Sequence, residues 1–224
     1  MKVVIIGAGQ GLGKVLSQML RSRGHEVVSG FRNITSDDWT KQAGILGLPM
    51  DVAQETQLKE AAAVVKNQLG EVDAVVDVAG ILLKNDRSLN LLEEPLEEIR
   101  QHLEVNAVGV LASFRAFYPI MKKGGMFLAV TSEGGSFASA GSLFPAYGIS
   151  KTAANKVVQT LRCTVDDVEI LAVHPGRMNT EMGRTTAQIE AEEAAEGFCD
   201  ILEGKTAVEG NAWFIDYKGM EMPL

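Results

Sequence analysis

The sequence predicts an α/β protein: a doubly wound, mainly parallel sheet of about seven strands flanked by helices. Short apolar runs alternate with helical segments along the whole chain, a pattern that favours right-handed βαβ crossovers and a parallel sheet. The loops rich in glycine or serine follow the ends of expected strands, where α/β proteins bind ligands. No repeat, low-complexity tract or linker divides residues 1–224, so we expect a single domain.

Each expected strand is a short apolar run that stops at or just before a glycine or a polar residue. The first run follows Met1-Lys2 directly, and the fourth stops at Ala79-Gly80. In chain order, the seven runs are 3–6, 26–29, 46–50, 74–78, 126–131, 169–173 and 212–217.

The segments between the strands have the composition of helices. The first glycine-rich turn opens a helix over 14–23, and an Ala-rich amphipathic segment predicts another over about 54–69. One long helix is expected over roughly 95–122, before a Gly-Gly turn. A further helix contains Tyr147, after a loop rich in serine and glycine, and an acidic helix covers about 186–202.

Composition and charge exclude several classes of protein. The formal net charge of −8 argues against a general binder of nucleic-acid phosphates. No apolar run reaches the ~18 residues that a membrane span needs, and the first strand begins too early to leave room for a signal peptide. We therefore expect a cytoplasmic protein with no nucleic-acid or membrane partner and with reduced Cys163 and Cys199. No residue cluster has the spacing of a metal site, and His102 is expected on a helix surface.

Three glycines at the end of the first strand predict a dinucleotide site. Gly7, Gly11 and Gly13 have the spacing Gly-x-x-x-Gly-x-Gly. The first permits a tight turn, and the later ones let a pyrophosphate and a helix approach the backbone. The following helix offers free N–H groups and a partial positive charge to the anion. The same turn contains Gly9, Gln10 and Leu12, which we include in the site.

The segment after the second strand indicates which dinucleotide is preferred. An NAD site places an Asp or Glu here to accept a hydrogen bond from the ribose, and none occurs between Val27 and Thr35. Arg32 is instead suited to a 2′-phosphate, although a solvated loop arginine is the alternative. We therefore expect NADP(H) to be preferred over NAD(H).

Tyr147 and Lys151 form a pair with catalytic character. Residues four apart share one face of a helix, so the ammonium of Lys151 can lie near the phenol of Tyr147. A phenol titrates near ~10 and is a poor acid–base catalyst at neutral pH unless a neighbouring charge lowers its pKa. Next to a dinucleotide site, the pair suggests carbonyl–alcohol redox chemistry.

With these segments in order, the chain resembles the short-chain dehydrogenase/reductases over essentially its full length. The resemblance implies a Rossmann fold. Within the family it is most similar to the C-factor and Sniffer-like carbonyl reductases, through residues 104–109, 174–183 and 213–219. The landmarks that carry the family resemblance are Gly7-x-x-x-Gly11-x-Gly13, Asp51-Val52, Ala79-Gly80, Asn106-Ala107-Val108-Gly109, Thr131-Ser132, Tyr147-x-x-x-Lys151 and Pro175-Gly176-x-x-x-Thr180.

The resemblance implies a role for each of four catalytic residues. Tyr147 would be the acid in carbonyl reduction and the base in alcohol oxidation, and Lys151 would lower its pKa and hold the nicotinamide ribose. Ser132 would hydrogen-bond the substrate oxygen. Asn106 would hold a water that links Lys151 to solvent, although an Asn that bonds its own helix is the alternative. Further residues implied for the cofactor site are Asp51, Val52, Ala79, Gly80, Pro175, Gly176, Met178 and Thr180.

Two loops are expected to enclose the substrate. Residues 132–146 would form one wall, and residues 177–190 would contain a mobile lid over 181–187. Ser132 is favoured over its polar neighbours because it ends a strand, with Gly135 three residues beyond it. The competing hydroxyls are those of Thr131, Ser136, Ser139 and Ser142.

Two positions depart from the family pattern. Ile6 stands where the family usually has a Thr that ties the first strand to the loop after the fourth. Asp77-Val78 replaces two asparagines in that loop, and a buried Asp77 needs a hydrogen-bond donor. We expect altered detail on the adenosine side rather than lost activity.

Together these patterns predict an NADP(H)-dependent reductase of a small carbonyl compound, with Tyr147 as proton donor. A dinucleotide-sensing protein and a pteridine reductase are the alternatives. The helices over 96–121 and after Tyr147 make up the usual dimer face of the family, so a homodimer or homotetramer is expected.

Overall fold

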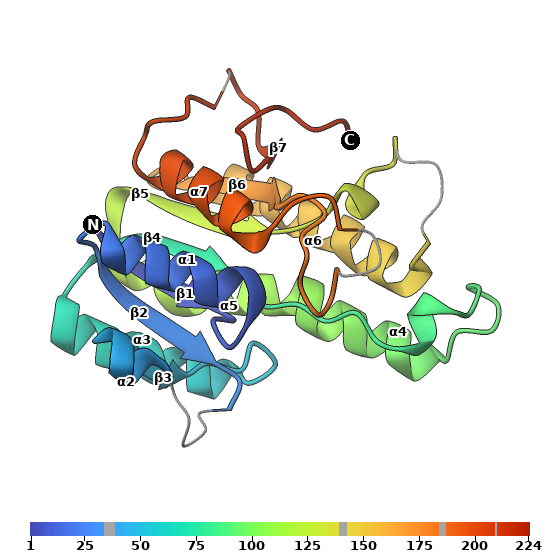
Figure 1. Cartoon of the computed structure of the whole chain (residues 1–224), viewed down its shortest axis with the longest axis horizontal. Helices are drawn as coiled ribbons and strands as arrows, with labels where there is room; N and C mark the ends of the chain where they lie inside the picture. Colours follow the sequence, from blue (N-terminus) through green and yellow to red (C-terminus); the bar gives the residue numbers. More distant parts are fainter. Residues whose placement is uncertain (34–38, 139–142, 184–186, 209) are drawn as a thin grey trace.

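A seven-stranded parallel sheet forms the centre of the molecule in this computed structural model (Figure 1), which describes residues 1–33, 39–138, 143–183, 187–208 and 210–224. Every pairing between neighbouring strands is parallel, and the order is β3-β2-β1-β4-β5-β6-β7. The predicted doubly wound sheet is therefore confirmed. The strands are β1 (Lys2–Ile6), β2 (Glu26–Phe31), β3 (Leu46–Pro49), β4 (Val72–Asp77), β5 (Met121–Val130), β6 (Glu169–His174) and β7 (Phe214–Asp216).

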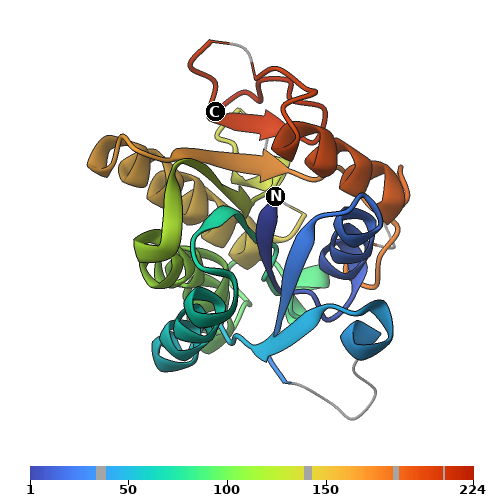
Figure 2. The same cartoon turned by 90° about the vertical axis from the view of Figure 1, so that its left-hand side faces the viewer.

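Helices cover both faces of the sheet, as Figure 2 shows. α1 and α7 pack together on one face, and α3, α5 and α6 cover the other. The central strands are apolar on both sides because each face is buried under helices. The helices are α1 (Gly11–Ser22), α2 (Trp39–Ala43), α3 (Glu55–Leu69), α4 (Leu96–Leu103), α5 (Gly109–Phe117), α6 (Pro145–Thr164) and α7 (Ala191–Leu202).

The strand order reverses between β1 and β4, and two loops meet there. The backbone N–H of Val78, just after β4, donates to the carbonyl of Ile6 at the end of β1, with an N···O distance of 2.9 Å. A Cβ added to Gly7 would lie 2.6 Å from the nitrogen of Ala79, so only glycine fits between the loops. The Ile6 side chain cannot form a hydrogen bond between β1 and the loop after β4, and this backbone hydrogen bond connects them instead. In α/β proteins, ligands bind in the crevice at such a reversal.

The long helix expected over 95–122 is interrupted and ends earlier. After α4 the chain forms a π turn, η2 (Glu104–Val108), and after α5 a 3-10 turn, η3 (Tyr118–Ile120). Pro119 lacks an N–H and cannot continue the helical hydrogen bonds, so Met121, which we expected in the helix, begins β5. His102 is also misplaced by the prediction: it is fully buried because α4 packs against α6.

The acidic helix begins at Ala191 rather than near residue 186. Ile189, which precedes it, pairs with Met178 in an isolated parallel bridge and therefore stays extended. Two further 3-10 turns were not predicted, η1 (Asn85–Arg87) and η4 (Glu133–Gly135). Within the described ranges, every helix is too short or too polar to cross a membrane.

Candidate active site

The turn between β1 and α1 fits a pyrophosphate. Gly7 and Gly11 have φ angles of 85° and 53°, in the left-handed region that favours glycine. α1 begins after Gln10, whose side chain makes no capping bond, and its first turn carries no acidic residue. The N–H groups and the positive end of the helix dipole therefore remain available to an anion. A Cβ on Gly9 would touch only the Phe31 ring, at 3.9 Å, which leaves room for a ligand above this residue.

Gly13 has a different function, because it lets α1 approach the turn. A Cβ at this position would collide with the carbonyl oxygen of Gly7 and lie 3.0 Å from the Cα of Ala8. Leu12 faces the opposite way, into the core beneath α1, and is 3% exposed. Of the predicted glycine-turn residues, Gly9 and Gln10 are thus exposed to a ligand, and Leu12 and Gly13 support the turn.

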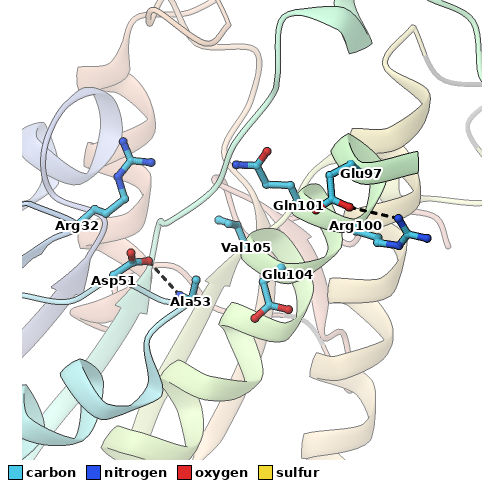
Figure 3. Close-up of a pocket in the computed structure, with 8 residues that line it drawn as sticks. All are labelled: Arg32, Asp51, Ala53, Glu97, Arg100, Gln101, Glu104 and Val105. Carbon is cyan, nitrogen blue, oxygen red and sulfur yellow. Dashed lines mark hydrogen bonds and ion pairs between the residues drawn. The ribbon is translucent and has the colours of Figure 1, made fainter. Parts of the chain in front are cut away.

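A cavity of about 570 Å³ lies beyond the glycine turn, at the ends of β2 and β3 (Figure 3). Arg32 stands on one side of it, across from Gln101 and Glu104. Asp51 also lines the cavity and is oriented by a hydrogen bond from the Ala53 N–H, at 3.0 Å. The structure thus places Arg32 and Asp51, both of which were expected in the cofactor site, on one cavity.

Val52 does not line this cavity but packs beneath it. Its side chain is 5% exposed, and a Cβ on Gly109 would lie 2.7 Å from its Cγ2. Val52 therefore fixes the loop that carries Asp51 against the start of α5, rather than offering a surface of its own.

Tyr147, Ser132 and Lys151 converge at the carboxyl end of the sheet. Tyr147 and Lys151 lie in the first two turns of α6, and Ser132 follows the end of β5. The Ser132 side chain lies near the Tyr147 hydroxyl. The Lys151 Nζ lies 5.6 Å from the centroid of the Tyr147 ring and donates to the Val130 carbonyl, at 2.8 Å.

The expected lowering of the Tyr147 pKa is absent. Burial raises the pKa of the Tyr147 phenol to about 12, with a smaller contribution from the Glu133 charge, and the nearby Ser132 hydroxyl opposes this shift. Burial also lowers the pKa of Lys151 to about 8, against the opposing charge of Asp77. The ammonium donates to the Val130 carbonyl and lies over the ring, and among the described residues no hydrogen bond joins it to the phenolic oxygen.

Asn106 occupies the π turn, and its side chain bonds to groups outside its own helix. Its Oδ1 accepts from the Ile81 N–H at 2.8 Å, and its Nδ2 donates to the Ile81 carbonyl and to Ser150, both at 2.9 Å. A Cβ on Gly80 would lie 3.3 Å from that Oδ1 and 3.4 Å from the Lys151 Nζ. Gly80 therefore separates Asn106 from Lys151, and π turns are frequent at functional sites.

Asp77, one of the departures from the family pattern, is buried at the end of β4. Its Oδ1 accepts from the Ala79 N–H at 3.0 Å, which supplies the donor that the sequence required. Burial raises the pKa of Asp77 to about 6, while the Ser113 hydroxyl, the Ala79 N–H and the Lys151 charge oppose this rise. A second buried charge therefore faces Lys151 from the sheet.

The loop after β6 reaches back to the glycine turn. Pro175 is buried, and Gly176 has a φ of 80°. Thr180 packs against Gly11: a Cβ on Gly11 would lie 3.4 Å from its Cγ2. Met178 pairs with Ile189, which closes the base of the predicted lid. The lid positions 184–186, and Ser139 and Ser142 in the other loop, lie outside the described residues.

A smaller cavity of about 440 Å³ lies at the ends of β5, β6 and β7. Glu133, His174 and Arg177 line it, and Arg177 pairs with Glu133 at 2.5 Å. His174 accepts from the Glu133 N–H at 3.2 Å, and burial lowers the pKa of its imidazole. The sequence did not connect these residues, because they come together only where three strands end.

Asp86 is the other residue that the sequence did not single out. It is fully buried, and its carboxylate accepts hydrogen bonds from the backbone N–H groups of Ala146 and Tyr147. It lies in a polar loop without a motif, and no local pattern marks a contact that spans 60 residues of chain.

Comparison with known proteins agrees with this site. The family model described as short chain dehydrogenase matches residues 1–191. The chain is 26% identical over 249 residues to the short chain dehydrogenase gsfK of Penicillium aethiopicum, with 98% of each chain covered. It is 27% identical over 188 residues to an NADPH-dependent pterin aldehyde reductase of Arabidopsis thaliana, covering 80% of this chain and 76% of the relative.

Among solved structures, a carbonyl reductase from Pseudomonas aeruginosa PAO1 in complex with NADP is similar. The TM-score is 0.86 and the identity 25%, over 100% of this chain and 99% of that one. Fold and site are those of a dinucleotide-dependent oxidoreductase. The chain belongs to the short-chain dehydrogenase/reductase family and is an NAD(P)-dependent dehydrogenase or reductase.

Proposed function

We propose that this protein is an NADP(H)-dependent reductase of small carbonyl compounds, of the kind found in the C-factor and Sniffer-like subgroup. The observation that carries the proposal is the convergence of Tyr147 and Ser132 at the carboxyl end of the sheet, with the Lys151 ammonium over the tyrosine ring. A substrate oxygen placed between the two hydroxyls would be within reach of a proton donor and a second hydrogen-bond donor.

Each of the four polar side chains has a separate task in the proposed reaction. A nicotinamide cofactor supplies the hydride when it is bound. Tyr147 donates its phenolic proton to the carbonyl oxygen as that oxygen gains negative charge, and the Ser132 hydroxyl stabilises the same charge. Lys151 lies in the second turn of α6, where its charge favours ionisation of Tyr147 once the ammonium leaves Val130. Asn106 holds the Ile81 backbone beside Gly80 and so shapes the space next to Lys151.

The residues around the glycine turn fit the dinucleotide. The N–H groups of the first turn of α1 would bind the pyrophosphate, and Gly9 leaves space for it. Arg32, on the wall of the larger cavity, would pair with a 2′-phosphate, whereas Asp51 would meet the adenosine part. The NADP complex of the similar Pseudomonas carbonyl reductase supports NADP(H) as the preferred cofactor.

A pteridine reductase is the second candidate. The observation that favours it is the similarity to the NADPH-dependent pterin aldehyde reductase of Arabidopsis thaliana. Both candidates use the same four side chains, so only the substrate distinguishes them. A dinucleotide sensor differs from both because it would bind the cofactor without turnover.

The test is a titration followed by an activity panel. Binding of NADPH and NADH is measured by fluorescence, and oxidation of NADPH is then followed with aldehydes, ketones, quinones and pterins. The proposal expects tighter binding of NADPH and turnover with at least one carbonyl compound. Turnover with pterins alone would support the pteridine reductase, and tight binding without any turnover would support the sensor. Absence of binding would contradict all three.

A further inference from the structure

Helix α6, which carries Tyr147 and Lys151, has no local cap at its N-terminus. Its N-cap position is Phe144, an apolar residue that cannot accept hydrogen bonds through its side chain, and Pro145 follows. In a capped helix, the N-cap side chain accepts from the N–H groups of the second or third helical residue. In α6 these residues are Ala146 and Tyr147. The catalytic tyrosine therefore supplies one of the N–H groups that require an acceptor.

Asp86 provides the acceptor from a distant part of the chain. Its Oδ1 accepts from the Ala146 N–H at 2.8 Å, and its Oδ2 accepts from the Tyr147 N–H at 2.9 Å. The side chain is fully buried. A buried carboxylate is normally costly, but here it bonds two backbone donors at the positive end of a 20-residue helix. Both oxygens are therefore used to hold the first turn of α6.

His102 does not compete for the Asp86 carboxylate, although its Nε2 lies 3.9 Å away. Its Nδ1 contacts the Glu98 carbonyl at 2.8 Å, which can only accept, so Nδ1 carries the hydrogen. Its Nε2 contacts the Leu83 N–H at 3.2 Å, which can only donate, so Nε2 accepts. Both ring nitrogens are thus engaged by backbone groups, and the Asp86 carboxylate is satisfied by the start of α6.

The turn that contains Asp86 is fixed on both sides. Asn85 donates to the Glu98 carboxylate of α4 at 2.7 Å. Arg87 donates to the Met182 carbonyl, in the predicted lid segment, at 2.7 Å, and its guanidinium lies 5.8 Å from the centroid of the Phe144 ring. The cap is therefore part of a rigid turn that contacts α4, the lid segment and the residue before α6.

We propose that Asp86 is a positioning residue for the reaction: by capping α6 it holds Tyr147 in the position where its hydroxyl meets Ser132. This inference rests on the proposed function. Lys151 is one turn further along α6 and is anchored separately to Val130. Loss of the cap therefore releases Tyr147 while Lys151 and the glycine turn keep their places.

The test compares Asp86→Asn with Asp73→Asn. The first variant keeps the shape of the side chain but replaces one acceptor oxygen with a donor and removes the charge. Asp73 is a matched control, because it also accepts a backbone N–H from a distant segment, that of Lys2 at 2.6 Å, but at the opposite end of the sheet. For both variants, the measurements are kcat and the NADPH dissociation constant, the unfolding midpoint, and hydrogen exchange at the amides of Ala146 and Tyr147.

For Asp86→Asn we expect kcat to fall by about 10- to 100-fold, the loss typical of a misplaced catalytic group. The NADPH dissociation constant should stay within about twofold, since no cofactor-binding group moves. Exchange at the two amides should become faster. Asp73→Asn should lower the unfolding midpoint but leave kcat and the two exchange rates unchanged. Asp86→Glu, which retains the charge, should lose less activity and replaces Asp86→Asn if that variant does not fold.

Three outcomes would overturn the inference: an unchanged kcat in Asp86→Asn, unchanged exchange at the two amides, or equal losses of kcat in the Asp86 and Asp73 variants. Should the wild type reduce no carbonyl compound or pterin, the proposed function fails on its own. Hydrogen exchange would then still decide whether Asp86 holds the first turn of α6, because that measurement needs no substrate.

Discussion

The buried ammonium of Lys151 leads to a specific prediction for the pH dependence of the enzyme. Burial lowers its pKa to about 8, whereas burial raises that of Tyr147 to about 12. Asp77, which faces Lys151, has a pKa of about 6 and is ionised throughout the alkaline range. Of these three groups, Lys151 alone titrates between pH 7 and pH 10.

The direction and size of the change in kcat/KM with pH follow from this order of pKa values. Lys151 is about 90% protonated at pH 7 and about 10% protonated at pH 9. As the pH rises through 8, the positive charge that supports Tyr147 disappears. We therefore expect kcat/KM for NADPH, which reports ionisations of the free enzyme, to fall about tenfold per pH unit above pH 8.

The assay is NADPH oxidation at a saturating carbonyl concentration between pH 6 and pH 10, for the wild type and for Lys151→Arg. A guanidinium stays protonated over this range, so the variant should lose the inflection near pH 8 even if its activity is lower. A wild-type profile that is flat to pH 10 would refute the argument. So would an inflection near pH 8 that survives in Lys151→Arg, because the titrating group would then be another.

Three further predictions concern Tyr147, Arg32 and the pair of glycines Gly9 and Gly13. Tyr147→Phe should bind NADPH normally and lose about 10²- to 10⁴-fold in kcat; retained turnover would show that Tyr147 is not the acid. Arg32→Ala should raise the NADPH dissociation constant by about 10- to 100-fold and change that of NADH little, as measured by isothermal titration. Equal losses of affinity for both cofactors would reject the contact between Arg32 and the 2′-phosphate. Gly13→Ala should lower the free energy of unfolding by about 1–3 kcal/mol, because its Cβ collides with the Gly7 carbonyl. In Gly9→Ala the added Cβ meets only the Phe31 ring at 3.9 Å, so this variant should keep the wild-type unfolding curve and only weaken NADPH binding. A similar loss of stability in both glycine variants would contradict the different roles assigned to Gly9 and Gly13.

Much of the fold and the family were predictable from local sequence. An apolar run such as residues 3–6, followed by three glycines at fixed spacing, has few structural solutions, because only glycine permits the backbone angles of the turn. The alternation of strands and helices then leaves a parallel sheet as the favoured arrangement. Boundaries were less certain: the continuous apolar pattern before Met121 hid the change from helix to strand.

The four proposed catalytic residues were named from the sequence, but their interactions were not. The pair Tyr147 and Lys151 follows from helical spacing, yet spacing does not show that Lys151 binds Val130 or that Tyr147 is buried. Burial depends on every neighbour, so the rise of the Tyr147 pKa, opposite in sign to the expectation, appears only in the folded chain.

The sequence by itself determined the sheet, the glycine turn and the order of the family motifs, since these depend on backbone preferences and on the period of apolar residues. The tertiary structure decided which polar groups meet: Lys151 with Val130, Asn106 with Ile81, and Asp86 with the start of α6. The physical reason is distance along the chain. A carboxylate that caps a helix 60 residues away leaves no local pattern, because its partners are backbone N–H groups, which every residue except proline carries.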